Sequence, residues 1–360
     1  MPDLLVTGGA GFIGANFVHY WLNQYPQDKV VVLDALTYAG NRANLHSQAA
    51  NPRLFFVQGN ICDTSLVEQL LTTHGLHHVV HFAAESHVDR SISNPDAFIE
   101  TNIVGTYSLL KACKKIWLDA PVQAGQSAVP HRFHLVSTDE VYGSLESSDA
   151  AFSESSVYAP NSPYSASKAA ADHLVRAYHK TYGLQVTTSH CANNYGAYQY
   201  PEKLIPLVIT NILRERILPV YGDGLQVRDW LYVDDHARAL DSILQHGRSG
   251  ECYNIGGKNE WTNIAIVQLI CRLLDVEFAR DDALANQYPA ALSARAGRSA
   301  DLIRFVQDRP GHDRRYAINP AKALHELGYR PAEDFASGLA KTLQWYLHNP
   351  AWWLPLLAAD

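Results

Sequence analysis

The stretch Thr7-Gly8-Gly9-Ala10-Gly11-Phe12-Ile13-Gly14 follows a short apolar run and precedes a segment with helical periodicity. Its glycines permit a tight turn, a close approach of the backbone to a pyrophosphate, and close packing of a helix on a strand. The amino end of that helix would add N–H groups and a partial positive charge. The stretch therefore predicts a dinucleotide-binding unit of strand, turn and helix at the start of the chain.

Asp34 ends the next apolar run, twenty residues after Gly14. A carboxylate at this place accepts hydrogen bonds from an adenosine ribose and repels a 2′-phosphate. We therefore expect NAD rather than NADP as the cofactor. The alternative interpretation is a structural glycine turn in an unrelated α/β protein.

Short β-branched runs alternate with amphipathic segments through the first half of the chain. The runs expected as strands are 4–7, 30–33, 54–57, 78–82, 133–137 and 186–189. This alternation predicts an α/β fold with a doubly wound parallel sheet. After about residue 195 the pattern loosens into mixed helix and loop, and residues 276–300 carry no interpretable motif. We expect an NAD-binding Rossmann domain over 1–195 and a smaller, mainly substrate-binding lobe over 196–360, with segments that interleave back into the first domain.

Composition excludes several classes of protein. The 360 residues are 47% hydrophobic and 18% charged, and the net charge of −7 includes no basic run, which argues against a nucleic-acid partner. Five cysteines without a C-x-x-C pair indicate a reducing compartment. The chain shows no signal peptide, and the apolar stretch 351–359 is too short to span a bilayer. We expect a cytoplasmic protein.

Tyr164 and Lys168 form a second motif, preceded by Pro163. Proline suits a helix start, and the i, i+4 spacing puts the phenol and the ammonium group on one face. A lysine cation and a nicotinamide charge would favour the phenolate, which could then accept a sugar hydroxyl proton. Alone, such a pair is more often a surface tyrosine and a solvated lysine.

The tripeptide Thr138-Asp139-Glu140 ends an expected strand between these two motifs. A simple dehydrogenase needs a hydroxyl, a tyrosine and a lysine, so two further carboxyl groups suggest acid and base chemistry for an elimination. The two groups must then hold different protonation states, which like-charge proximity and partial burial can arrange. An isolated Asp-Glu pair would otherwise be a solvated strand end or a helix cap.

Six further motifs narrow the interpretation: HFAAESHVD at 81–89, STDEVYG at 137–143, NNYG at 193–196, PEKLIP at 201–206, RDWLYV at 228–233 and DRPGHD at 308–313. With these motifs the chain resembles the extended short-chain dehydrogenase/reductase family, and within it the dTDP-glucose 4,6-dehydratases, from the first strand to roughly residue 346. The resemblance implies a lyase that oxidises C4 of dTDP-glucose with NAD, eliminates water across C5 and C6, and returns the hydride to C6. Thr138, Asp139, Glu140, Tyr164 and Lys168 would be its catalytic residues.

The resemblance also implies the binding residues. Those for NAD are Gly8, Gly11, Phe12, Ile13, Gly14, Asp34, Ala35, Leu36, Thr37, Asn60, Ile61, Phe82, Ala83, Ala84, Glu85, Ser86, Thr101, Tyr164, Lys168 and Asn194. Those for the nucleotide sugar are Ser86, Thr138, Asn193, Lys203, Leu204, Pro219, Val220, Tyr221, Arg228, Asn263, Asp308, Arg309, Pro310, Gly311 and His312. Arg228 and Arg309 are natural diphosphate partners, because planar guanidinium groups pair bidentately with phosphate oxygens.

One departure from the family pattern concerns the cofactor. Asn60 stands where the family usually has aspartate, so we expect weaker retention of NAD. A second departure, Ala197 in place of a common proline, affects only a turn.

Alternatives and partners complete the expectations. An epimerase, a decarboxylase or another nucleotide-sugar dehydratase on the same scaffold is the second hypothesis, and a silent NAD-binding protein is the third. We expect no metal site, because the histidines at 74, 77, 78 and 81 lack a complete set of ligands. Family members usually form homodimers through helices near 98–116 and 164–181, where Tyr107, Leu109, Leu110 and Tyr178 provide either partner contacts or core packing.

Overall fold

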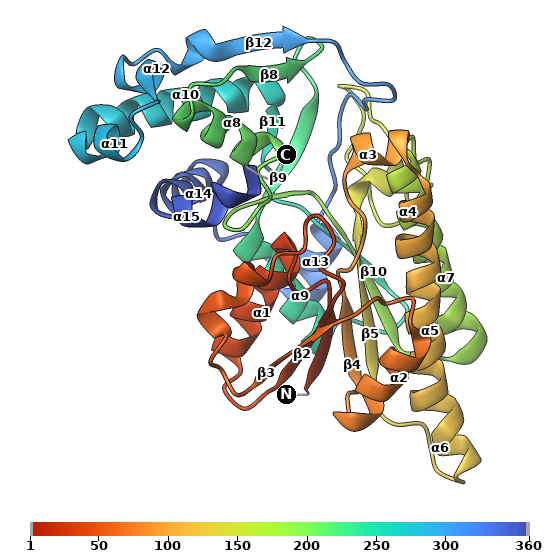
Figure 1. The fold of residues 1–360 in the computed structure, drawn as a ribbon. Helices are drawn as coiled ribbons and strands as arrows, with labels where there is room; N and C mark the ends of the chain where they lie inside the picture. The colour runs from red at the N-terminus through yellow and green to blue at the C-terminus, as the bar shows by residue number, and fades with distance from the viewer. Residues whose placement is uncertain (1–2, 358–360) are drawn as a thin grey trace.

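A seven-stranded parallel sheet forms the centre of the protein (Figure 1), whose computed structural model describes residues 3–357. Its strand order is β10-β6-β5-β4-β1-β2-β3. The strands are β1 (Leu4–Thr7), β2 (Val30–Asp34), β3 (Leu54–Gln58), β4 (His78–His81), β5 (Arg132–Thr138), β6 (Val186–Cys191) and β10 (Cys252–Ile255). The predicted fold class and the six predicted strands are confirmed, with ends that differ by a residue or two.

Helices cover both faces of this sheet (Figure 1). On one face α1 (Phe12–Gln24), α9 (Val233–His246) and α13 (Ala321–Leu327) pack in one apolar cluster with the sheet. On the other face α2 (Thr64–Thr73), α5 (Thr106–Lys114) and α7 (Pro163–Tyr182) form a second cluster. The shorter helical segments of this half are η1 (Arg42–Gln48), α3 (Val88–Ser93), α4 (Asp96–Phe98), η2 (Ile99–Gly105), η3 (Lys115–Asp119), α6 (Ala120–Gln123) and η4 (Asp139–Tyr142).

A smaller lobe lies beyond the carboxyl ends of the strands and has its own apolar core (Figure 1). Two small sheets belong to it, one of β7 (Asn193–Tyr195), β9 (Val227–Tyr232) and β11 (Glu260–Thr262), the other of β8 (Leu218–Tyr221) and β12 (Ile303–Val306). Its helical segments are α8 (Leu204–Leu213), α10 (Asn263–Arg280), α11 (Asp282–Gln287), α12 (Leu292–Arg295), η5 (Ser299–Leu302), α14 (Phe335–His348), α15 (Pro350–Trp353) and η6 (Pro355–Leu357). Residues 276–300 therefore form the end of α10, two short helices and the start of η5, and they bury Leu284, Tyr288 and Ala294 in the lobe core.

The chain crosses between the two parts more than once. After leaving the sheet at β6 and forming β7 and α8, it returns through α9 and β10, and β10 pairs in parallel with β6. The division at residue 195 stays a prediction, and the segment 233–255 belongs to the first core by its packing.

The start of α7 fixes the position of the Tyr164 and Lys168 pair. Ser162 and Ser165 form a reciprocal capping box, and Pro163 occupies the first helical turn. The helix ends at Gly183, whose φ of 76° is in the left-handed region. Within residues 3–357, no helix is both long and apolar enough to cross a membrane.

Candidate active site

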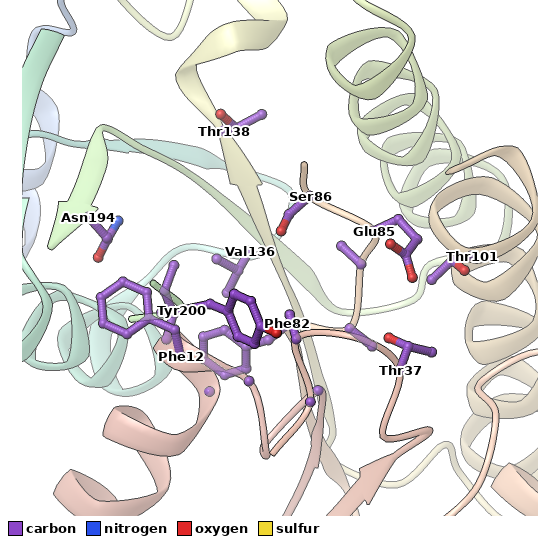
Figure 2. A pocket seen from close by; sticks show the side chains of 18 of the residues that line it. Phe12, Thr37, Phe82, Glu85, Ser86, Thr101, Val136, Thr138, Asn194 and Tyr200 are labelled. Atoms are coloured by element: carbon purple, nitrogen blue, oxygen red, sulfur yellow. The ribbon is translucent and has the colours of Figure 1, made fainter. Parts of the chain in front are cut away.

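A cavity of about 320 Å³ opens where the sheet strands end (Figure 2). In this view Thr37, Glu85 and Thr101 lie on one side of the cavity, and Phe12, Tyr200 and Asn194 on the other. Thr138 lies at the end of β5 between them. A cavity at the carboxyl ends of parallel strands is the usual ligand site of an open α/β sheet.

Most of the predicted cofactor and catalytic residues line this one cavity, together with Asn193 and Lys203, which were predicted for the nucleotide sugar. They are Gly8, Gly11, Phe12, Ile13, Gly14, Asp34, Ala35, Thr37, Asn60, Ile61, Phe82, Ala83, Ala84, Glu85, Ser86, Thr101, Thr138, Asp139, Glu140, Tyr164, Lys168, Asn193, Asn194 and Lys203. Leu36 does not line it, and neither do the predicted substrate residues from Leu204 onward.

The Gly-rich turn leaves no room for side chains. A Cβ atom at Gly14 would overlap the carbonyl oxygen of Gly8, and one at Gly8, where φ is 71°, would lie 2.5 Å from the Ala83 nitrogen. Asp34 accepts the N–H groups of Ala10 and Leu36, each at 2.8 Å, so its carboxylate is held at the cavity wall. The glycine turn exposes main chain that fits the pyrophosphate of a dinucleotide, and the fixed Asp34 carboxylate fits its ribose.

Asn60 lines the cavity, but its side chain is partly committed to its own loop. Its Oδ1 accepts the N–H of Cys62 at 2.9 Å. The second lone pair of Oδ1 and the NH₂ group can still form hydrogen bonds with an adenine ring, but without the negative charge that aspartate would bring.

Two loops that line the cavity and helix α3 meet through residues to which the sequence analysis assigned no role. The guanidinium of Arg90 lies 3.9 Å from the ring centre of Tyr38, and its Nη2 lies 3.6 Å from Oε2 of Glu202. Tyr38 also meets Tyr200 edge to face, with ring centres 6.0 Å apart. Glu202 lies in the PEKLIP motif at 201–206, but these contacts could not be predicted, because the segments are adjacent only in the folded chain.

Lys168 and Tyr164 are both deeply placed in the cavity wall. Lys168 donates from Nζ to the Val136 carbonyl at 2.8 Å, and burial lowers its pKa. Burial raises the pKa of Tyr164 well above 10, and the Glu140 charge adds to this, whereas a hydrogen bond with Thr138 opposes it. The expectation that Lys168 and a nicotinamide charge together favour the phenolate stays a prediction, since burial dominates the pKa of Tyr164 in the protein alone.

Asp139 and Glu140 begin η4 and differ in their surroundings. Asp139 is 2% exposed, and burial first, then the charges of Glu140 and Asp229, raise its pKa well above the usual range. Burial also raises the pKa of Glu140, but Arg228, Arg309 and Lys203 oppose that rise. The two neighbouring carboxyl groups therefore have different electrostatic surroundings, and the pKa of Asp139 is raised more strongly than that of Glu140.

The cations near Glu140 come from the second lobe and its connections. Arg228 donates to the carbonyl oxygens of Val227 at 2.8 Å and Asp313 at 2.9 Å, and it stacks on Tyr316 with 4.1 Å to the ring centre. Arg309 pairs with Asp89 at 3.2 Å. Both arginines lie near Glu140 but outside the set of residues that line the cavity, and Arg228 is the one held by several contacts.

The other predicted substrate residues are spread over the lobe. Pro219, Val220 and Tyr221 lie on β8, Leu204 and Asn263 begin helices, and Asp308, Pro310, Gly311 and His312 lie in the segment after β12. Val220 is 2% exposed and packs in the lobe core, so only its main chain is left for a ligand. His312 bonds to Asp308 at 2.6 Å.

Among the buried polar atoms of cavity-lining residues that have no hydrogen-bond partner within residues 3–357 are Ser137 Oγ, Asp139 Oδ2, Asn193 Oδ1 and Gln199 Oε1. Buried polar atoms are almost always paired, so these atoms indicate a polar ligand. No group of three His, Cys, Asp or Glu side chains in the described part of the chain could hold a metal ion. His81, for example, bonds to Thr7 and Thr106 in the core.

A parallel sheet whose Gly-rich turn shares one cavity with a helix-borne tyrosine and lysine is the architecture of the short-chain dehydrogenases/reductases. The added lobe over that cavity is typical of their extended class. Residues 5–342 match the family model described as GDP-mannose 4,6 dehydratase.

The chain is 52% identical over 357 residues to dTDP-glucose 4,6-dehydratase of Neisseria meningitidis serogroup B, covering 99% of this chain and 96% of that relative. It resembles the crystal structure of DesIV, a dTDP-glucose 4,6-dehydratase of Streptomyces venezuelae with NAD bound, at 48% identity with a TM-score of 0.84 and coverage of 98% and 99%. A UDP-glucose 4-epimerase of Thermus thermophilus in complex with NAD is more distant, at 27% identity with a TM-score of 0.78 and coverage of 96% and 99%. The chain belongs to the dTDP-glucose 4,6-dehydratase family.

Proposed function

We propose that this protein is a lyase that converts dTDP-glucose to dTDP-4-keto-6-deoxyglucose. The relatives at about half identity over nearly the full chain carry that activity in their names. The single observation of this structure that carries the proposal is the split environment of Asp139 and Glu140, which provides an acid and a base side by side.

The cofactor side of the cavity fits NAD. The main chain from Gly8 to Gly14 would hold the pyrophosphate, and Asp34 would accept the ribose hydroxyls. Because a carboxylate at this position repels a 2′-phosphate, the same residue favours NAD over NADP. NAD, when bound, supplies the hydride acceptor for sugar C4 and later the hydride donor for C6.

Tyr164 takes the proton of the C4 hydroxyl in this account. Its buried phenol needs added positive charge before it can act as a base, since burial holds its pKa high. Lys168 provides one positive charge in the same wall, and Thr138 bonds to the phenol and can also orient the C4 oxygen.

Glu140 and Asp139 then remove water. A ketone at C4 makes the C5 proton acidic, and ionised Glu140 accepts that proton. Protonated Asp139 gives its proton to the C6 hydroxyl, which leaves as water. Glu140 returns a proton to C5 when C6 is reduced. Asp139 takes up a proton from solvent, and Tyr164 releases to solvent the proton that it took from the C4 hydroxyl, so all three groups recover their starting states.

The diphosphate of the substrate would lie toward Arg228 and Arg309. Arg228 is held by two carbonyl bonds and a ring stack, so its planar fork is already oriented. The same cations oppose the rise in the pKa of Glu140, and they therefore link substrate binding to the acid and base chemistry.

Mass spectrometry after incubation with dTDP-glucose tests the proposal. We expect a product that has lost one water while the bound cofactor ends unchanged. A product of unchanged mass would support an epimerase instead, and no turnover with NAD still bound would support a silent binding protein. A panel of dTDP-, UDP-, CDP- and GDP-sugars tests the nucleobase.

We also propose a cytoplasmic homodimer. Ile99, Val104, Tyr107 and Tyr182 are exposed apolar side chains on η2, α5 and α7. Leu109 and Leu110 are fully buried in the core of this chain, so their interpretation as partner contacts is wrong. Sedimentation analysis of wild type and Tyr107→Glu tests the dimer, which the variant should weaken.

A further inference from the structure

A continuous set of buried hydrogen bonds lies behind the cavity and joins the elements that carry the catalytic groups. Its members are Tyr142, Tyr158, Asp172, His190 and Asn254. None of these side chains lines the cavity, so none can touch a ligand there.

The connections follow a simple order. Tyr142 ends η4, and its hydroxyl lies 3.0 Å from His190 Nδ1 and 2.9 Å from Asn254 Oδ1. His190 Nε2 lies 2.9 Å from Asp172 Oδ2 and 2.8 Å from the hydroxyl of Tyr158. Asp172 lies four residues after Lys168 on α7. The turn of Asp139 and Glu140 is thereby tied to the helix of Tyr164 and Lys168.

The bonding partners also assign the protons. Asn254 donates from Nδ2 to the Phe152 carbonyl at 3.0 Å, so its Oδ1 must accept the Tyr142 hydroxyl hydrogen. His190 Nδ1 must then donate to the Tyr142 oxygen. Tyr158 donates to Asp172 Oδ2 at 3.0 Å.

We propose that His190, held between Asp172 and Tyr142, positions the Asp139-Glu140 turn for the elimination step. The inference rests on the proposed function and names positioning residues for it. Buried hydrogen-bond networks rigidify their surroundings, and in this one only Asp172 Oδ1 lacks a partner within residues 3–357. The turn needs such support, because η4 spans only four residues and Tyr142 is its polar anchor to the sheet.

The residues of the oxidation step, Tyr164 and Lys168, are held in place by other contacts. Lys168 bonds directly to the Val136 carbonyl, and the capping box at Ser162 fixes the start of the helix that carries Tyr164. Loosening the turn should therefore slow the elimination and leave the oxidation nearly intact. A purely structural role would slow both steps or neither.

Tyr142→Phe in a single-turnover experiment tests this. Reduced nicotinamide is followed by absorbance, and water loss by quenched mass spectrometry. We expect water loss to slow by about 10- to 100-fold, as for a misplaced acid and base. Oxidation should keep its rate, and reduced cofactor should accumulate. Tyr288→Phe is the matched control, since it also removes a buried hydroxyl, donated to the Leu347 carbonyl at 2.6 Å, in the other lobe. It should change neither rate.

A second variant tests the proposal if Tyr142→Phe does not fold. Tyr158→Phe removes the outer donor of the network and should slow water loss in the same direction by a smaller factor. Equal slowing of both steps, unchanged water loss, or failure of both variants to fold would overturn the proposal. Absence of water loss by the wild-type protein would overturn the proposed function as well, so the two failures are distinguishable.

Discussion

The cofactor side and the Glu140 side of the cavity differ in the groups that form them. The cofactor side consists largely of main chain from consecutive residues, where the turn from Gly8 to Gly14 packs against β4 and its loop. The Glu140 side depends on the cations of Lys203, Arg228 and Arg309, which come from distant segments and are each held by an acceptor of their own. Binding on the cofactor side should therefore be sensitive to side-chain atoms added to the glycines. Binding on the Glu140 side should be sensitive to the loss of a positive charge or of a planar guanidinium group.

The difference extends to catalysis. Added cations on one side oppose the rise in the pKa of Glu140, while Asp139 lies deeper, beside two other carboxylates. The end of the sheet thus buries Asp139 away from solvent, and the second lobe supplies the positive charges near Glu140. Together they make the pKa values of the two neighbouring carboxyl groups differ.

Adding one methyl group to the cofactor side should have the largest effect. The Cβ of Gly14→Ala would overlap the Gly8 carbonyl, so we expect NAD binding to weaken by more than about 10³-fold, or about 4 kcal/mol. Calorimetric titration with NAD measures this. Gly338→Ala, which also adds a clashing Cβ within a helix but in the other lobe, should bind NAD normally when folded. Equal affinity in wild type and Gly14→Ala would contradict the close-packed turn.

Removing the proton from Asp139 should reduce the turnover of the enzyme next most strongly. Asp139→Asn retains shape but cannot donate a full proton, so kcat should fall on the order of 10²-fold. Because burial raises the pKa of Asp139 and it acts protonated, wild-type activity should fall as pH rises through that pKa. Glu140 must be ionised, so activity should also fall as pH drops through its raised pKa. The alkaline limb should disappear in the variant.

The same substitution has a stability signature. Since the pKa of Asp139 is raised on folding, its stabilising contribution is complete below the unfolded pKa and is lost as pH rises through the folded value. Asparagine does not titrate. The Tm of Asp139→Asn should therefore exceed that of wild type by more at alkaline than at acidic pH, and a constant difference would contradict the buried neutral acid.

Arg228→Lys keeps a charge but loses the planar fork and the stack on Tyr316. We expect KM for the nucleotide sugar to rise by about tenfold, since one bidentate, stacked cation is lost. The affinity for NAD should stay unchanged, because Arg228 does not line the cofactor cavity. Steady-state kinetics measure KM for the nucleotide sugar, and titration measures the affinity for NAD. An equal loss of both affinities would contradict the proposed division of the cavity.

The smallest effect concerns Asn60. Asn60→Asp can keep the bond to the Cys62 N–H and adds a charge toward adenine, so NAD should dissociate about two- to fivefold more slowly. Asn319→Asp is the matched control, because its Oδ1 likewise accepts a main-chain N–H two residues ahead, at Ala321, away from the cavity. Faster loss of NAD from Asn60→Asp would contradict the expectation.

The sequence predicted the parts of the molecule that consecutive residues determine. Six strands, the turn from Gly8 to Gly14 and the lining role of Thr138 to Glu140 follow from local patterns, and the structure brings them together. Strand β10 was missed, because its mixed residues Cys252–Ile255 become a strand through parallel pairing with β6. The contact of Arg90 with Tyr38 and Glu202, and the burial that raises the pKa of Tyr164, depend on packing between distant segments.

Glu140→Gln in a single turnover in D₂O tests the central claim, that a neighbouring acid and base remove water after C4 is oxidised. The variant keeps Tyr164 and Lys168, so reduced cofactor should form. The amide cannot accept the C5 proton, so the recovered sugar should carry no deuterium at C5 and no water should be lost. Dehydrated product at the wild-type rate would contradict the account.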